Sequence, residues 1–595
     1  MIKYSLECLD KINREHSFKN IFDILCSHGD RPALEFKIDK EIKIVTFRQM
    51  EFVVEYVADK IKANYNFPAN SFVGIHLENC PEWIVIYWAI LMAGYRPFFI
   101  DYRLMPEKTR YYLEQTRAAA VITGNHTGDV FYEGTDTIDA YVLLSRDHKE
   151  LYKVATETVK EGTLPQRISE YEWADEMALC TSGTTGDAKI YTYDGTAISY
   201  QLMSARPVIM ANERISSDRT MKNLAFLPLH HIFGFMACYL WYSFFAGSLV
   251  FVEKIAPSVL FAACKEHKVT HILAVPLLVN SIVKGVNRQL SEQPEYKRKM
   301  FKILCDVSIF LQRINPEWGI KVAKKIFKNL VLDKLAGTSV EVIICGGGHV
   351  LPDCMRTINA MGYYTLCGFG MTEVGISSLE YRKSVDKRIA GCVGIPVTAI
   401  EYKIVPADES NPNVGELFIR GKFIHSGRVK DGEVLPPDTD SDGWFTTGDI
   451  GRLEDDALYI EGRVKDVIIN ESGENVYPDE LEDYFGDIDG VSQFTVMGVK
   501  NKPEDKYESI TLVIRTEREI TEEFKSYILD QVANRCDKLP FNKKINTVVA
   551  TNMDLPVSSS GKIKRLEIKK QLENNSDEYI LLKGRNMQIN KVLKR

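Results

Sequence analysis

The sequence predicts an α/β fold with two unequal domains: a large N-terminal domain with mainly parallel sheets and a sheet-rich end, and a small mobile α+β C-terminal domain. Three observations predict it. The chain has 595 residues, which is more than one hydrophobic core usually supports. Apolar strand-like runs alternate with helical patterns through most of the chain. After Gly415 the pattern changes to short strands and turns.

The alternating part contains a series of short apolar runs that we expect to be buried strands. A helix is expected at 83–92, ending at Gly94, just before one of them. Strands that alternate with helices favour parallel sheets. The expected strands are residues 73–77, 97–101, 119–123, 224–227, 271–275 and 340–345.

Residues 232–252 form an uncharged stretch of about 21 residues, long enough to be weighed as a membrane-spanning helix. Gly234, Ser243, Gly247 and Ser248 interrupt it. A buried helix at 235–245, a turn and a strand at 248–252 therefore fit the pattern better.

The C-terminal part is expected to begin with strands at 415–420 and 456–460, which form the sheet-rich end of the large domain. A boundary is placed near Glu461-Gly462-Arg463, because the following residues contain enough strands, turns and helices for a small α+β domain. We therefore predict domains at 1–462 and 463–578, followed by a basic tail at 579–595.

Composition and charge narrow the possible functions. Apolar residues make up 45% and charged residues 26%, as in soluble domains, and the net charge of -7 argues against nucleic-acid binding. Acidic residues near the N-terminus argue against a signal peptide, so a cytoplasmic location is expected. The twelve cysteines form no CxxC pair, so we expect reduced thiols and no zinc site.

One loop contains hydroxyl side chains, glycines and a lysine in a pattern suited to phosphate. Glycines allow backbone N–H groups to turn inward, hydroxyls add donors, and a lysine supplies positive charge. The spacing is not that of a Walker loop, and a polar surface loop is the alternative. The candidate residues are Thr181, Ser182, Gly183, Thr184, Thr185, Gly186 and Lys189.

This loop resembles the Thr-Ser-Gly-Thr-Thr-Gly-x-Pro-Lys-Gly loop of the acyl-adenylate-forming superfamily, which includes acyl-CoA synthetases. Ala188 and Ile190 replace the usual proline and glycine. Further segments follow in the family's order and extend the resemblance to Lys562. The chain is most similar to medium- or long-chain acyl-CoA synthetases.

The resemblance implies roles for two segments of the large domain. In 227–234, His231 would lie beside the acyl pocket, although a half-buried histidine packed on aromatic rings is the alternative. In 368–373, Phe369 would stack on adenine between Gly368 and Gly370. Thr372 would approach the α-phosphate and Glu373 would bind Mg²⁺, whereas a Thr-Glu pair by itself is more often a helix cap.

Three later segments complete the resemblance. Asp449 would accept the ribose hydroxyls and Arg463 would contact the nucleotide, with Lys465 as the hinge of the small domain. Gly473 would line the thiol tunnel, and Lys562 would be the catalytic lysine. Taken singly, these residues also fit ordinary turns or solvent-facing loops.

The resemblance implies an enzyme that uses ATP and Mg²⁺ to activate a carboxylic acid as acyl-AMP, and then coenzyme A to form a thioester. Residues 232–252 contain no acid to pair with an amino group, so a fatty or other apolar acid is expected. Transfer to an acyl carrier protein and a nucleotide-binding relative without turnover remain alternatives. The segment Lys297–Lys334 is rich in bases and fits either peripheral membrane contact or a solvated surface.

Overall fold

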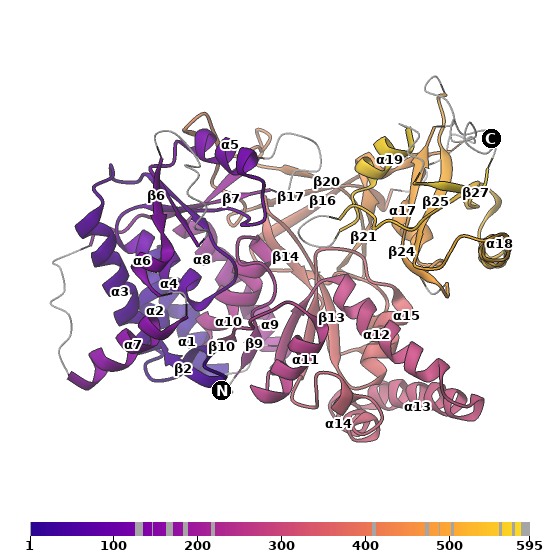
Figure 1. The fold of residues 1–595 in the computed structure, drawn as a ribbon, viewed down its shortest axis with the longest axis horizontal. Coiled ribbons are helices and arrows are strands. Elements are labelled where there is room, and N and C mark those ends of the chain that lie inside the picture. Colours follow the sequence, from indigo (N-terminus) through magenta and orange to yellow (C-terminus); the bar gives the residue numbers. More distant parts are fainter. Residues whose placement is uncertain are drawn as a thin grey trace. The chain divides into compact units, whose positions relative to one another are not determined.

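The computed structural model describes residues 2–124, 135–145, 147–161, 171–181, 189–215, 221–406, 412–470, 475–486, 488–500, 505–557, 562–573 and 578–584. These residues divide into two compact units (Figure 1). Unit 1 comprises Met1–Gly347, Asp353–Glu401 and Ile419–Phe445. Unit 2 comprises Gly348–Pro352, Tyr402–Phe418 and Thr446–Arg595.

Unit 1 contains a large sheet whose central strands are parallel and whose two ends are antiparallel. Its strands, in spatial order, are β15 (Ile395–Pro396), β14 (Gly375–Leu379), β13 (Tyr364–Met371), β12 (Val342–Cys345), β11 (His271–Ala274), β9 (Lys222–Leu224), β10 (Ser248–Val250), β1 (Pro32–Ile38) and β2 (Glu41–Thr46).

A second sheet of unit 1 has the same design, with a parallel core and an antiparallel extension. Its order is β19 (Glu433–Leu435), β18 (Gly427–Lys430), β8 (Ile190–Asp194), β7 (Glu176–Cys180), β4 (Arg96–Phe99), β3 (Phe72–His76), β5 (Ala120–Thr123) and β6 (Asp136–Asp139).

Helices connect and cover these strands (Figure 1). The sequence explains α4 well, because proline at its start fits the first turn and all of its residues, including Trp83 and Trp88, are buried. The helices are α1 (Ile2–Ile12), α2 (Phe18–Cys26), α3 (Phe47–Asn64), α4 (Pro81–Met92), α5 (Pro106–Thr116), α6 (Ala140–Leu143), α7 (Lys149–Glu161), α8 (Gly195–Met203), α9 (Ala205–Ala211), α11 (Pro257–Glu266), α12 (Pro276–Ser291), α13 (Glu295–Ile314), α14 (Pro316–Phe327), α15 (Pro352–Ala360) and α16 (Val385–Ile389).

The predicted α/β class with largely parallel sheets is confirmed. One strand was misplaced, because we expected residues 224–227 to be extended, whereas β9 occupies Lys222–Leu224 and the chain turns at Ala225. Continuous hydrophobicity marks burial, but it does not show where a buried strand ends.

The uncharged stretch 232–252 forms a buried helix and a strand, as expected. A π-helical segment, η1 (Phe233–Leu240), continues into α10 (Trp241–Phe244) and is followed by β10. Among the described residues, no helix is both long and apolar enough to cross a bilayer.

A four-stranded sheet follows in the order β16 (Ile400–Pro406), β17 (Val414–Gly421), β20 (Phe445–Glu454) and β21 (Ala457–Arg463). The remainder of unit 2 is α+β, as predicted. It contains η3 (Val464–Asp466), β22 (Ile468–Ile469), β23 (Asn475–Val476), α17 (Pro478–Glu482), β24 (Val491–Val499), β25 (Ser509–Thr516), α18 (Glu522–Cys536), η4 (Phe541–Lys543), β26 (Thr547–Thr551), α19 (Arg565–Glu573) and β27 (Ile580–Lys583).

The two compact units do not meet at residue 462, where we predicted a domain boundary. The predicted boundary, with its hinge, remains a prediction. Unit 2 already includes Thr446–Gly462 and the segment Tyr402–Phe418. The predicted tail at 579–595 was too long, because β27 (Ile580–Lys583) pairs with β26. Residues 585–595 lie outside the described part of the chain.

Arg388 shows how unit 1 satisfies a deeply buried charge. The fully buried guanidinium donates to Asn359 Oδ1 at 3.0 Å, the Lys383 carbonyl at 2.7 Å and Gln312 Oε1 at 3.1 Å. It also lies over the Tyr364 ring, 3.9 Å from the centroid. These contacts join α13, α15 and β13, so they fix the sheet end that leads into the candidate site.

We predict that Arg388→Met lowers the stability of unit 1 by about 2–4 kcal/mol, because it removes donors from buried acceptors. The measurement is the apparent melting temperature of the full chain. Arg313→Met is the matched control, because the Arg313–Asp386 pair lies at the surface and should contribute little. Equal shifts for the two variants would contradict the structural role assigned to Arg388.

Candidate active site

The base of the predicted phosphate loop is closed by backbone pairing. Thr181 follows β7 and Lys189 precedes β8. The Thr181 N–H donates to the Lys189 carbonyl at 2.9 Å, and the Lys189 N–H donates to Thr181 Oγ1 at 3.1 Å. The antiparallel β7–β8 pair therefore holds both ends of the loop together. Residues Ser182, Gly183, Thr184, Thr185 and Gly186 lie outside the described residues, as do Asp187 and Ala188.

The Lys189 side chain has an acidic partner far away in the sequence. Its Nζ lies 3.2 Å from Asp438 Oδ2, and about half of the lysine side chain is exposed. Asp438 follows β19, which pairs with β18, and β18 in turn pairs with β8, the strand that Lys189 precedes. The ammonium group is thus held at the mouth of the loop while remaining accessible to an anion.

The segment Gly368–Glu373 runs along β13 and into a tight turn, where Thr372 and Glu373 lie between β13 and β14. Gly375 is required at the start of β14, because its φ is +79° and a Cβ atom there would overlap the Gln201 side chain. Gln201 is buried and donates to the Val374 carbonyl at 2.8 Å. The Thr-Glu pair therefore lies in the turn of a β-hairpin and not at the start of a helix.

His425 connects this turn to the partner of Lys189. Its Nδ1 donates to the Glu373 carbonyl at 2.8 Å, and its Nε2 accepts from the Asp438 N–H at 3.2 Å. Burial lowers the pKa of His425 below its ordinary value, so the ring is neutral near pH 7. Both ring nitrogens are used, which identifies His425 as a positioning residue for the Glu373 turn.

An apolar cavity of about 70 Å³ adjoins the same strand. Gly368, Phe369 and Gly370 form part of its wall, opposite Ile232 and Phe233 from the start of η1. No acidic residue lines it among the described residues. The buried Tyr242 hydroxyl belongs to a wall residue and has no hydrogen-bond partner in the described part of the chain. The cavity thus suits an apolar group next to the predicted adenine segment.

His231 immediately precedes the wall residue Ile232, and its ring lies 4.5 Å from that of His230. Asp101, His230 and His231 place three possible metal-ligating atoms within 4.8 Å of one another, a grouping that sequence spacing missed. Arg103 donates to both oxygens of Asp101, at 2.9 and 3.1 Å. Arg103 therefore balances the charge of the Asp101 carboxylate.

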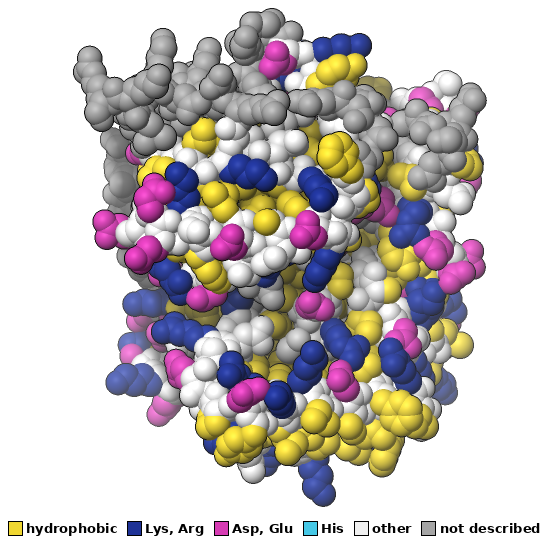
Figure 2. Space-filling model, turned by 90° about the vertical axis from the view of Figure 1, so that its right-hand side faces the viewer, with side chains coloured by type: hydrophobic (Ala, Val, Ile, Leu, Met, Phe, Trp, Pro, Cys, Tyr) yellow, Lys and Arg dark blue, Asp and Glu magenta, His cyan; other side chains and the backbone are white. Residues whose placement is uncertain are grey.

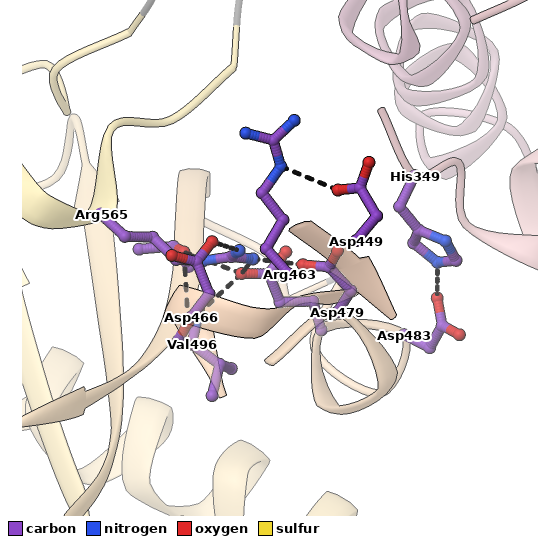
Figure 3. A network of polar contacts seen from close by, with 10 residues as sticks. His349, Asp449, Arg463, Asp466, Asp479, Asp483, Val496 and Arg565 are labelled. Atoms are coloured by element: carbon purple, nitrogen blue, oxygen red, sulfur yellow. Dashed lines mark hydrogen bonds and ion pairs between the residues drawn. The ribbon is translucent and has the colours of Figure 1, made fainter. Parts of the chain in front are cut away.

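Unit 2 contains the other predicted nucleotide residues. Asp449 in β20 and Arg463 at the end of β21 are register partners, and Arg463 Nε lies 3.0 Å from Asp449 Oδ1 (Figure 3). The other oxygen, Asp449 Oδ2, is buried and has no hydrogen-bond partner among the described residues. Burial raises the pKa of Asp449, while the charges of Arg463 and Lys562 oppose that shift.

Arg565 binds three carboxylates at the centre of unit 2 (Figure 3). Its guanidinium lies 3.0 Å from Asp466 and 2.9 Å from Glu482, and it also contacts Asp479. Burial pushes the pKa of Asp479 upward, but the Arg565 charge outweighs this effect and leaves it below the usual value. Arg565 thereby ties η3 and α17 to the segment that carries Lys562.

Lys562 is exposed, and its charge acts on both Asp449 and Asp479. Lys465 is exposed in the turn η3, next to Asp466 and its bond to Arg565. Its predicted hinge role remains a prediction, as does that of Gly473, which lies outside the described residues.

Comparison with known proteins identifies the family. The model of the AMP-binding enzyme family matches residues 25–427, more than half of the sequence. The chain belongs to the AMP-binding enzyme family. The match includes the Lys189 loop, the Glu373 turn and His425, but ends before Asp449.

Relatives of this AMP-binding enzyme include acyl-CoA ligases. A long-chain-fatty-acid–CoA ligase of Salmonella typhimurium is 24% identical over 581 residues, covering 90% of this chain and 91% of the relative. Long-chain-fatty-acid–CoA ligase 2 of Schizosaccharomyces pombe is 27% identical over 335 residues, covering 52% and 46% of the two chains.

The fold is shared with solved structures. An o-succinylbenzoate coenzyme A synthetase from Bacillus subtilis, in complex with ATP and magnesium ion, has a TM-score of 0.67 at 20% identity. The likeness covers 92% of this AMP-binding enzyme and 98% of that chain.

Sequence reasoning missed His425, Asp438 and Arg565. His425 and Asp438 stand in no local pattern that marks a site, and each meets its partners through strand pairing. Arg565 was visible as the arginine that follows Gly-Lys in the Lys562 segment, but no local pattern indicated that three carboxylates surround it.

The pair between His349 and Asp483 of unit 2 predicts a pH dependence (Figure 3). Burial lowers the pKa of His349, but the hydrogen bond to Asp483, at 2.5 Å, outweighs burial and raises the pKa above its ordinary value. The stabilisation is therefore fully present below the ordinary pKa of about 6.5 and is lost as the pH rises through the raised value.

We predict that His349→Gln lowers the apparent melting temperature at about pH 5.5, and that this difference shrinks as the pH is raised from about 6.5 toward about 8. Thermal unfolding of both proteins across this range is the measurement. Asp483→Asn should produce the same loss, and the double variant should add nothing further, because both changes remove one interaction. A pH-independent difference would show that the pair does not act through histidine charge.

Proposed function

We propose that this AMP-binding enzyme uses ATP to convert a carboxylic acid into an acyl-adenylate and then transfers the acyl group to coenzyme A. The observation that carries the proposal is the family match, joined by the order of the motif residues from Thr181 to Lys562. The named acyl-CoA ligases among its relatives agree with this reaction.

The residues present suit the parts of ATP. Asp449 Oδ2 is a buried acceptor without a partner among the described residues, and a ribose hydroxyl would supply the missing donor. Phe369 lines the apolar cavity and offers a ring for adenine. Lys189 at the loop base offers a positive charge for phosphate.

Magnesium would neutralise phosphate charge when bound, and the carboxylate of Glu373 is the hard oxygen ligand that it prefers. The chain's own residues position that carboxylate, because His425, Tyr193 and Gln201 fix the backbone of the turn. Tyr193 Oη donates to the Thr372 carbonyl at 2.7 Å, which orients Thr372 as well.

The reaction brings together two anions, a carboxylate and the α-phosphate. The carboxylate oxygen forms a bond to the α-phosphorus as the bond to pyrophosphate breaks, so positioning and charge neutralisation would provide most of the catalysis. We assign Lys562 this neutralising role. For the second step, movement of 463–578 about Lys465 would withdraw Lys562 and admit the thiol past Gly473.

The acid-free apolar cavity favours a fatty or other apolar acid as the substrate. His231 directly precedes the wall residue Ile232, which supports its proposed place beside the acyl group. A volume of about 70 Å³ holds only a few atoms, so a long acyl chain requires the walls to open.

The acyl acceptor could instead be an acyl carrier protein. A comparison of kcat/KM for coenzyme A and for a holo carrier protein decides between the two acceptors. Peripheral membrane contact through Lys297–Lys334 is a further part of the proposal.

The first test is ATP–pyrophosphate exchange with a panel of free acids of graded length. We expect exchange that depends on an apolar acid and on magnesium, followed by release of AMP when coenzyme A is added. Tight ATP binding without exchange for any acid would refute the proposed enzymatic activity and favour a nucleotide-binding relative without turnover.

Lys562→Ala should lower acyl-adenylate formation by about 10²–10³-fold, because the transition state loses a neutralising charge. Thioester formation from supplied acyl-AMP should remain largely intact, since the proposal withdraws this lysine in that step. Lys564→Ala is the control, because Lys564 forms a surface pair with Glu567. Equal loss of both half-reactions in Lys562→Ala would contradict the two-position model.

A further inference from the structure

Helix α13 carries a continuous row of large exposed apolar side chains. These residues are 43–67% exposed, and they recur at alternating intervals of four and three residues along 20 residues of helix. That spacing places them on one face. We call this row the α13 stripe, and it consists of Tyr296, Met300, Ile303, Val307, Phe310 and Ile314.

The opposite face of α13 already packs on unit 1. Cys305, Ser308, Ile309 and Gln312 are buried, and Ser308 Oγ donates to the Ala360 carbonyl at 2.6 Å. The helix is therefore anchored by its inner face and does not need the stripe for folding. Single exposed apolar residues are ordinary on a protein surface, whereas a contiguous row marks an interaction site.

Basic residues accompany the stripe. Lys297, Arg298, Lys299 and Lys302 lie in the first half of α13 and are exposed. Lys321, Lys325 and Lys328 recur at one-face spacing on and just after α14, where Trp318 is also exposed. Figure 2 shows hydrophobic side chains gathered at the lower end of the molecule, in the region of α13, with Lys and Arg side chains close by.

Not every base of this region is available. Lys324 points inward and donates to the carbonyls of Thr338 and Val340, and burial lowers its pKa to about 8. The acids of α13 are occupied within the chain, because Glu295 lies 2.7 Å from Lys299 and Asp306 lies 2.8 Å from Arg356. The pair with Glu295 balances the charge of Lys299, whereas Lys297, Arg298 and Lys302 leave an excess of positive charge on the exposed surface beside the stripe.

We propose that the α13 stripe docks onto the surface of a bilayer containing anionic lipids, with α13 lying in the interface. Apolar side chains would enter the acyl boundary while the neighbouring lysines and arginines meet the negative headgroups, the arrangement of an interfacial amphipathic helix. Docking would give the enzyme direct access to an apolar acid dissolved in the bilayer, and this advantage rests on the proposed function. The docking itself does not depend on the proposed function.

The charge pattern favours this partner over a second copy of the chain. The spacing of the stripe would also suit a coiled coil. However, pairing two copies through this face would bring like charges together, and the acids that could compensate are already paired within each chain. A negatively charged bilayer complements the same residues.

The test is vesicle flotation of the full chain with phosphatidylcholine alone and with phosphatidylcholine plus phosphatidylglycerol. We expect binding to the anionic vesicles that weakens with added salt. Ile303→Asn with Phe310→Asn should reduce the partition coefficient by about tenfold or more, since both apolar anchors are lost. Lys297→Gln with Lys302→Gln should reduce binding to the anionic vesicles specifically.

Met210→Asn with Ile255→Asn is the matched control, because these residues are equally exposed but belong to α9 and to the segment before α11, outside α13 and α14. It should bind as the parent does. Unchanged melting temperature and unchanged exchange with a short water-soluble acid would show that the stripe variant is folded. Absence of binding to anionic vesicles, or equal binding by the stripe variant, would overturn the proposal. Dissociation of a dimer by the stripe variant, without vesicle binding by the parent, would overturn it in favour of a second copy.

Discussion

The neutral ring of His425 is the constraint on which the candidate site of unit 1 depends. One of its nitrogens donates to the Glu373 carbonyl and the other accepts from the Asp438 amide. Asp438 in turn holds Lys189. A protonated ring could not accept from an amide, so the burial that lowers the pKa of His425 also preserves the connection between the hairpin turn and the loop base.

That connection exists because antiparallel strands extend the ends of parallel sheets. Strand β18 adds to β8, and β14 adds to β13. The Glu373 turn joins β13 to β14, His425 immediately precedes β18, and Asp438 follows β19, so all three residues lie at the ends of these added strands. The apolar cavity is lined by Gly368 and Phe369, so an apolar group bound there would share a wall with the predicted adenine segment.

Unit 2 is organised by the opposite electrostatic arrangement, in which one cation holds several anions. Arg565 pairs with Asp466, Asp479 and Glu482, and it begins the helix α19 just after Lys562. The lysine and the turn that contains Lys465 are consequently attached to the same buried guanidinium. This attachment gives a physical basis for the small domain to move as one body in the proposed second step.

The sequence by itself determined the α/β class, the buried nature of residues 232–252 and the order of the motif segments, because periodicity, composition and motif spacing are local properties. It also located Thr181, Glu373, Asp449 and Lys562 as candidates. It misplaced the strand at 224–227 and extended the tail over β27, since apolar character does not define where pairing begins and ends.

Only the tertiary structure placed His425 between Glu373 and Asp438, surrounded Arg565 with carboxylates and left one oxygen of Asp449 without a partner among the described residues. The exposure of the α13 stripe, which shows that it forms a surface and not a core face, was also decided by the tertiary structure. In each case the deciding contacts join residues that are far apart in the chain, and no local pattern encodes them.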